Sequence, residues 1–73
     1  MEAEEIRKLE SYLRSKFQLP TIGIRRRPQK DDSAEVYIGD EFIGVLFRDD
    51  EDDDLSWSFE MAILEFDLEL PQS

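Results

Sequence analysis

The residues best suited to chemistry in this chain are six consecutive acids, Asp49–Asp54, which have hydrophobic sequence on both sides. Calcium binds oxygen ligands at alternate positions, and positions 1, 3, 5 and 12 of an EF-hand loop are matched by Asp49, Glu51, Asp53 and Glu60. Position 6 of such a loop needs glycine and is Asp54 here, and strand patterns rather than helices flank the run. These four residues are therefore weak metal candidates. We expect a solvated loop between two strands, because like charges repel one another and keep a segment open.

The chain contains no histidine and no cysteine, so the commonest side chains for acid–base and nucleophilic catalysis are absent. Ser33, Ser56 and Ser58 have no imidazole to activate them. Pairs of carboxylates are abundant, but they need a pocket that separates their pKa values, and a domain of this size rarely has one. We therefore expect no enzyme, no catalytic residue and no bound cofactor.

Charge is distributed unevenly along the chain, whose formal net charge is −10. Eight basic and four acidic residues give residues 1–30 a charge of +4, whereas fifteen acidic residues and one basic residue give residues 31–73 a charge of −14. The summed field repels phosphate, so we expect neither nucleic acid nor an anionic membrane as a partner. The basic stretch RRRPQK, residues 25–30, also lacks the interleaved aromatic residues of a nucleic-acid patch.

The sequence also indicates where the protein is located in the cell and how stable a domain of this size can be. No segment reaches the roughly 18 apolar residues of a membrane span. The N-terminal sequence MEAEEIRK lacks the basic-then-apolar order of a secretory signal, so we expect a cytoplasmic protein. A single domain of 73 residues without a disulfide has a thin stability margin, and association with a second subunit is the remaining means of support.

Hydrophobic periodicity predicts an α+β fold, with one N-terminal helix packed on an antiparallel meander of about four strands. The helix is expected over residues 2–17, where apolar residues recur at helical spacing and Leu19-Pro20 ends the pattern. The strands are expected at about 21–27, 34–39, 41–48 and 55–70. The first of them carries arginines and is stopped by Pro28, which suits an edge strand.

The central hairpin is expected to turn through two residues, either Gly39-Asp40, which suits a hairpin turn with glycine first, or Asp40-Glu41. Such a turn places Val36 and Ile38 on the same face of the sheet as Ile43 and Val45, whereas a three-residue turn would exchange the faces of one strand. The segment FIGVLF, residues 42–47, is apolar on both faces. Because one helix covers only one face of a small sheet, a second copy of the chain is the simplest cover for the other.

The last strand pattern changes phase. Residues 55–63 alternate with one set of apolar positions, and from Leu64 the opposite set is apolar. One strand over 55–70 would extend roughly 50 Å, at ~3.3 Å per residue, which is longer than such a domain is wide. The segment therefore forms a long bulged strand that bends near Ala62–Leu64, or a strand exchanged into a neighbour's sheet, or a terminal helix over 59–68. We expect Phe66 and Leu68 at an interface.

The meander also predicts where the opposite charges lie. The strands 21–27 and 41–48 end at the same edge of the sheet, so Arg25, Arg26 and Arg27 are expected to emerge near Asp49–Asp54. The two clusters would face one another within one chain or across a dimer, and such exposed pairs orient more than they stabilise.

A longer run resembles a known family. The residues KDDSAEVYIGDEFIGVL, 30–46, together with MAIL, 61–64, are similar to the small alphaproteobacterial group catalogued as domain of unknown function 3126. The resemblance covers nearly the whole chain. It implies no activity and no site, so no functional residue is transferred from it.

Two functional hypotheses follow. The first is a small cytoplasmic interaction or accessory module, homodimeric and without catalytic activity. The second is an acidic decoy or a cation-binding protein that acts through Asp49–Asp54.

Overall fold

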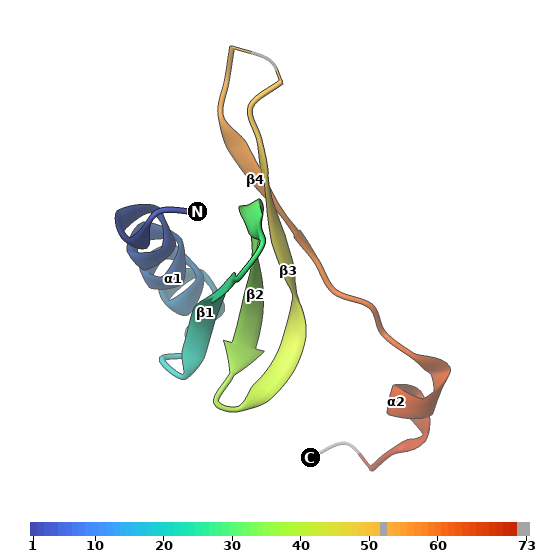
Figure 1. Ribbon diagram of the computed structural model, residues 1–73. Helices are drawn as coiled ribbons and strands as arrows, with labels where there is room; N and C mark the ends of the chain where they lie inside the picture. The colour runs from blue at the N-terminus through green and yellow to red at the C-terminus, as the bar shows by residue number, and fades with distance from the viewer. Residues whose placement is uncertain (52, 72–73) are drawn as a thin grey trace.

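The computed structural model describes residues 1–51 and 53–71. Helix α1 (Ala3–Phe17) lies against a four-stranded antiparallel sheet whose strands follow one another in chain order (Figure 1). The strands are β1 (Ile22–Arg27), β2 (Lys30–Ile38), β3 (Glu41–Asp49) and β4 (Ser56–Glu60), and a short helix α2 (Glu65–Glu69) follows. The predicted α+β class and the open meander are confirmed.

Helix α1 has the ends that its sequence predicts. Glu4 and Glu5 occupy the first turn and Arg14 and Lys16 the last, so their charges complement the helix dipole. Gln18 adopts a left-handed conformation with φ 53°, and the Leu19 N–H donates to the Arg14 carbonyl at 3.0 Å. This arrangement ends the helix just before Pro20.

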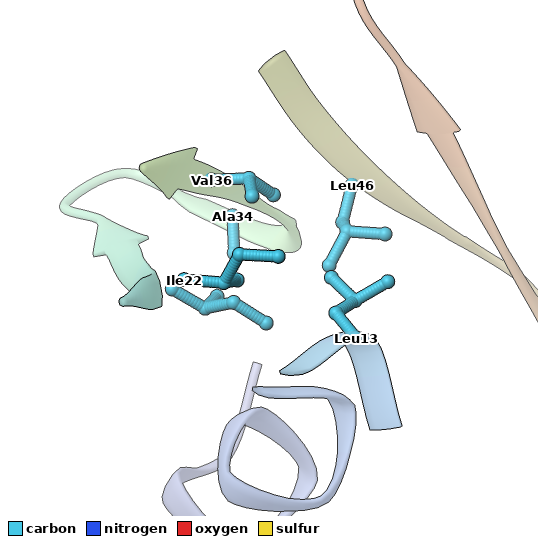
Figure 2. Close-up of a cluster of buried hydrophobic side chains, with 6 residues drawn as sticks. Leu13, Ile22, Ala34, Val36 and Leu46 are labelled. Carbon is cyan, nitrogen blue, oxygen red and sulfur yellow. The ribbon is translucent and has the colours of Figure 1, made fainter. Parts of the chain in front are cut away.

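The core lies between α1 and one face of the sheet, as Figure 2 shows. It consists of six buried apolar side chains, from the helix and three strands: Leu13, Ile22, Ile24, Ala34, Val36 and Leu46. Two of these six, Ile22 and Val36, are the largest fully buried side chains. A core of this size leaves little stability to spare, because small domains hide a small share of their surface.

The free edge of β1 is occupied by the helix. Glu10 Oε2 accepts from the Ile24 N–H at 2.9 Å, and Arg14 Nε donates to the Ile22 carbonyl at 2.7 Å. Glu10 and Arg14 also form an ion pair at 3.1 Å. The expected edge strand is therefore confirmed, and side chains of α1 satisfy the Ile24 N–H and the Ile22 carbonyl on its free edge.

Strand β2 begins earlier than its pattern predicts, at Lys30 rather than Ala34, because β1 and β2 are joined by a tight turn at Pro28-Gln29. Arg27 pairs with Lys30 and Arg26 with Ala34, so a bulge in β2 takes up the residues between. Lys30 to Asp32 are exposed and polar, so hydrophobic alternation could not reveal that they belong to a strand.

The central hairpin turns at Gly39-Asp40 as predicted, with Gly39 at φ 62°. However, Tyr37 pairs with Phe42 while Val36 pairs with Gly44, which leaves Ile43 as an extra residue in β3. This bulge exchanges the faces of the rest of β3. The predicted sharing of one face by Val36 and Val45 is wrong, because Leu46 takes the helix-facing position and Val45 lies opposite Glu35 on the other face.

Gly44 of β3 lies against the end of β4. A Cβ built at this position would be 2.6 Å from Phe59 Cε1 and would also meet the Glu60 carbonyl oxygen. The Phe59 ring covers the glycine and meets the Phe17 ring of α1 at 6.5 Å between centroids. The absent side chain at Gly44 thus lets Phe59 join the core.

The predicted strand over residues 55–70 is wrong in length. Strand β4 ends at Glu60, residues 61–64 are extended without a partner strand, and α2 occupies only Glu65–Glu69. The break falls where the alternation changes phase, and a terminal helix over 59–68 is also excluded. At the start of α2, the Leu64 N–H donates to Asp67 Oδ2 at 2.9 Å. Residues 61–71, here called the C-terminal arm, run away from the sheet (Figure 1).

Candidate functional site

The face of the sheet opposite α1, here called the helix-free face, carries an apolar groove of about 570 Å³. Its floor is formed by β3 residues and its far wall by the first part of the C-terminal arm. The apolar lining includes Phe42, Val45, Phe47, Met61 and Leu64. Phe42 is 51% exposed and Phe47 is 37% exposed, which is unusual for rings on a sheet face.

The bulge in β3 produces this groove. Beyond Ile43, the helix-facing positions are Gly44 and Leu46, so Val45 and Phe47 point away from the core. Their cross-strand neighbours are polar, since Val45 lies between Glu35 and Glu60 and Phe47 lies between Ser33 and Ser58. The predicted apolar character of both faces of FIGVLF is therefore present in the structure.

The C-terminal arm carries six of the twelve large apolar side chains that are exposed in the described residues. Its large apolar side chains are between 47% and 70% exposed: Met61, Ile63, Leu64, Phe66, Leu68 and Leu70. Within residues 1–51 and 53–71, α2 packs against no other helix or strand. The radius of gyration is 13.4 Å, compared with about 11 Å for a compact chain of this length. The predicted interface residues Phe66 and Leu68 are thus displayed to solvent.

Arg25 lies next to the groove on the helix-free face. Its guanidinium stacks on the Tyr37 ring at 3.9 Å, and that ring meets Phe42 edge-on at 5.7 Å. The Tyr37 hydroxyl donates to Glu35 Oε1 at 3.0 Å, and this bond raises the pKa of Tyr37 because the phenolate would lose it and face a carboxylate. Arg25 also pairs with the exposed Asp40 at 3.5 Å. A positive charge therefore stands at the Phe42 end of the groove.

The other two predicted interaction arginines lie elsewhere. Arg26 and Arg27 line a hollow of about 610 Å³ with Lys30 and Arg48, at the end of the β1–β2 hairpin. Arg27 Nη1 donates to Ser33 Oγ at 3.3 Å. In the described part of the chain, no ion pair joins Arg25, Arg26 or Arg27 to the acidic run. The contact between the two clusters within one chain is not observed, and contact across a dimer stays a prediction.

Asp49 ends β3, and the other described acids of the run, Asp50, Glu51, Asp53 and Asp54, lie in the predicted connection to β4; Asp52 is outside the described residues. The Glu51 N–H donates to Asp49 Oδ1 at 3.1 Å, which is a local turn contact. Asp49 pairs with Ser56, at the loop end of β4, whereas Glu60 ends the strand opposite Val45. The calcium-like spacing is therefore spread along a hairpin. Over residues 1–51 and 53–71, no three acidic side chains are placed to hold a metal ion.

We expect calcium to bind this loop only weakly and without a defined site. Loops of the sensor class have dissociation constants of about 10 μM or tighter, and they achieve them by converging five or more oxygen ligands. Calorimetry with calcium, with magnesium as the control, should give shallow and equal responses. A saturable calcium isotherm in the sensor range, absent for magnesium, contradicts this expectation.

Glu5 holds the β3–β4 hairpin to α1, and sequence reasoning missed it. Its carboxylate accepts from Arg48 Nη1 at 3.2 Å and from Trp57 Nε1 at 2.7 Å. The Glu5 side chain is only 14% exposed. Arg48 is the one basic residue after Lys30, and this was the available signal that it has a specific partner.

The fold and the exposed surfaces define a small α+β domain, in which one helix covers one face of an antiparallel meander and an apolar arm extends from its last strand. The chain belongs to the family described as protein of unknown function DUF3126, whose model matches residues 5–67. This match confirms the resemblance carried by residues 30–46 and 61–64. No curated protein and no solved structure matches the chain. No described helix is long and apolar enough to cross a membrane.

Proposed function

We propose that this protein is a small interaction or accessory module of the cytoplasm, homodimeric and without catalytic activity, whose interaction element is the C-terminal arm. The observation that carries the proposal is the exposure of the arm. Six large apolar side chains are exposed on this segment, and its helix α2 packs against no other helix or strand described. Soluble monomers rarely leave contiguous apolar patches of this kind in water, and such patches mark interaction surfaces.

Two further observations support self-association. The helix-free face adds the exposed rings of Phe42 and Phe47 to the apolar surface of the arm. Among the described residues the core has six buried apolar side chains, with partly buried ones packed around them, and the sequence has no cysteine for a disulfide to reinforce it. Burial of apolar surface contributes about 25 cal/mol per Å², so a second subunit would add stability that this core lacks.

The alternative is an acidic decoy or cation-binding protein that acts through Asp49–Asp54. The local negative charge is the one argument in its favour. The carboxylates described in this loop do not converge. The exposed arm has no role in that alternative, whereas an interaction module accounts for it. We therefore prefer the module.

Sedimentation tests the proposal. We expect the unmodified chain to be a dimer at about 100 μM, and Leu68→Glu or Phe66→Glu to shift it toward a monomer of lower stability, because a buried unpaired carboxylate opposes association. Gln29→Glu, in the exposed β1–β2 turn, adds the same charge away from the arm and should leave the dimer intact. A folded, monodisperse monomer of the unmodified chain would rule out the homodimer.

A further inference from the structure

We propose that the C-terminal arm of one copy lies in the groove on the helix-free face of a second copy, so that two chains exchange arms about a two-fold axis. This inference rests on the proposed function and identifies its contact. It joins two exposed apolar surfaces of the described residues, the arm and the groove, into one interface that is used twice.

The groove is incompletely filled by the arm of its own chain. Leu64 and Asp67 reach its margin, but a space of about 570 Å³ remains beside Phe42, Val45 and Phe47. The side chains beyond that margin gain no cover, since Phe66 is 65% exposed and Leu68 is 70% exposed. Within one chain, therefore, the apolar part of α2 and the groove stay apart.

The backbone at the groove also has room for an added segment. The β3–β4 ladder runs from Val45–Glu60 to Asp49–Ser56, so Glu41 to Ile43 have only β2 beside them. Residues 61–64 are extended but diverge from this part of β3 (Figure 1). An open strand edge next to apolar pockets is the arrangement that accepts an extended peptide by strand addition. The extended part of a second arm meets that requirement.

The charges beside the groove set the orientation of this occupant. The arm carries Glu65 and Glu69 on exposed positions, and Arg25 stands at the Phe42 end of the groove through its stack on Tyr37. The only described ion pair of Arg25, to Asp40, is exposed and therefore weak. The groove lining also carries the carboxylates of Glu60 and Asp67, so the acids of an incoming arm find a cation at the Phe42 end, and this sets the direction in which the arm lies.

A second copy fits these surfaces better than an unrelated partner because both halves of the contact are present on every chain. Reciprocal exchange pairs each arm with one groove, so the assembly closes at two chains and leaves neither surface over. The extended residues 61–64, which form no ladder, are long enough to redirect the arm without breaking a strand.

Paired charge variants test the inference. Phe47→Lys places a cation in the groove, and Leu68→Glu places an anion on the arm; each alone should weaken the dimer at least about tenfold. A mixture of the two variants contains one intact contact and one lysine–glutamate contact, so heterodimers should form at least about tenfold more tightly than either homodimer. Phe42→Lys is the second groove variant, and circular dichroism checks that each variant is folded.

Tyr12→Glu is the matched control, because Tyr12 is 59% exposed on α1, outside the groove. It should leave the association constant unchanged. If the unmodified chain is a dimer and folded groove variants retain its affinity, the arm docks elsewhere; the inference then fails while the proposed function stands. The exchange is also overturned if a groove variant dimerises weakly by itself and forms no tighter heterodimer when it is mixed with Leu68→Glu. A monomeric unmodified chain overturns the proposed function itself.

Discussion

Gly44→Ala is expected to lower the free energy of unfolding by about 3 kcal/mol, at the upper end of what overpacking costs. The added methyl would sit 2.6 Å from the Phe59 ring and would also meet the Glu60 carbonyl. One of these neighbours is backbone, so the conflict forces β4 away from β3 and pulls Phe59 from its contact with Phe17. Chemical denaturation monitored by Trp57 fluorescence measures the loss.

Gly23→Ala is the control for this substitution. A Cβ at Gly23 meets only Glu10 Oε2, at an ordinary 3.9 Å, so we expect no loss and a gain of up to about 1 kcal/mol from the stiffer unfolded chain. Equal stability of the two variants would mean that β3 and β4 are farther apart than the structure places them.

Glu5→Ala is expected to cost about 2 kcal/mol, because it leaves Arg48 and the Trp57 indole without their shared acceptor. Arg48 is 31% exposed, so water offsets part of the loss on that side. Glu4→Ala is the matched control, since Glu4 is 69% exposed and pairs only with exposed Arg7 and Lys8. A double-mutant cycle with Arg48→Met separates the ion pair from the indole bond.

If Glu5→Ala and Glu4→Ala have the same stability, the Glu5 contacts are surface contacts of no consequence. If instead Glu5→Ala lowers stability and the cycle shows no coupling to Arg48, the bond to Trp57 carries the effect.

The parts of the fold that could be predicted are those where one local sequence feature, such as hydrophobic spacing or a turn residue, determines the structure. Helix α1 follows from apolar residues at helical spacing and a proline after its end, and it begins within one residue of its expected position. The Gly39 turn follows from the need for a positive φ. The meander order follows from short connections, which join strands that lie side by side.

The parts that could not be predicted depend on tertiary contacts. A bulge at Ile43 leaves no mark on a segment that is apolar on both faces, because either set of residues suits the core. Strand β4 stops at Glu60 although alternation continues to Leu70, because alternation measures amphipathicity and says nothing about whether a partner strand is present.

The candidate site also has parts that the sequence predicts and parts that depend on tertiary contacts. The position of Phe66 and Leu68 outside the core could be predicted, because a small core has no room for every apolar residue, and the structure leaves both exposed; their place at an interface stays a prediction. The groove was not identifiable, because it exists only through the bulge in β3. The Glu5 contacts join residues that are 43 and 52 positions apart, and no local pattern reports contacts at such separations.

The occupied edge of β1 sets a limit on assembly. Glu10 and Arg14 take the backbone groups of Ile24 and Ile22 that an incoming strand would need, whereas no described element other than β3 lies alongside β4. Strand addition is therefore open at β4 and blocked at Ile22 and Ile24 of β1. An association that paired β4 of one chain with β4 of a second would use this edge on both chains and leave none for a third. Growth into a fibre, the usual hazard of an exposed strand, would then stop at the pair.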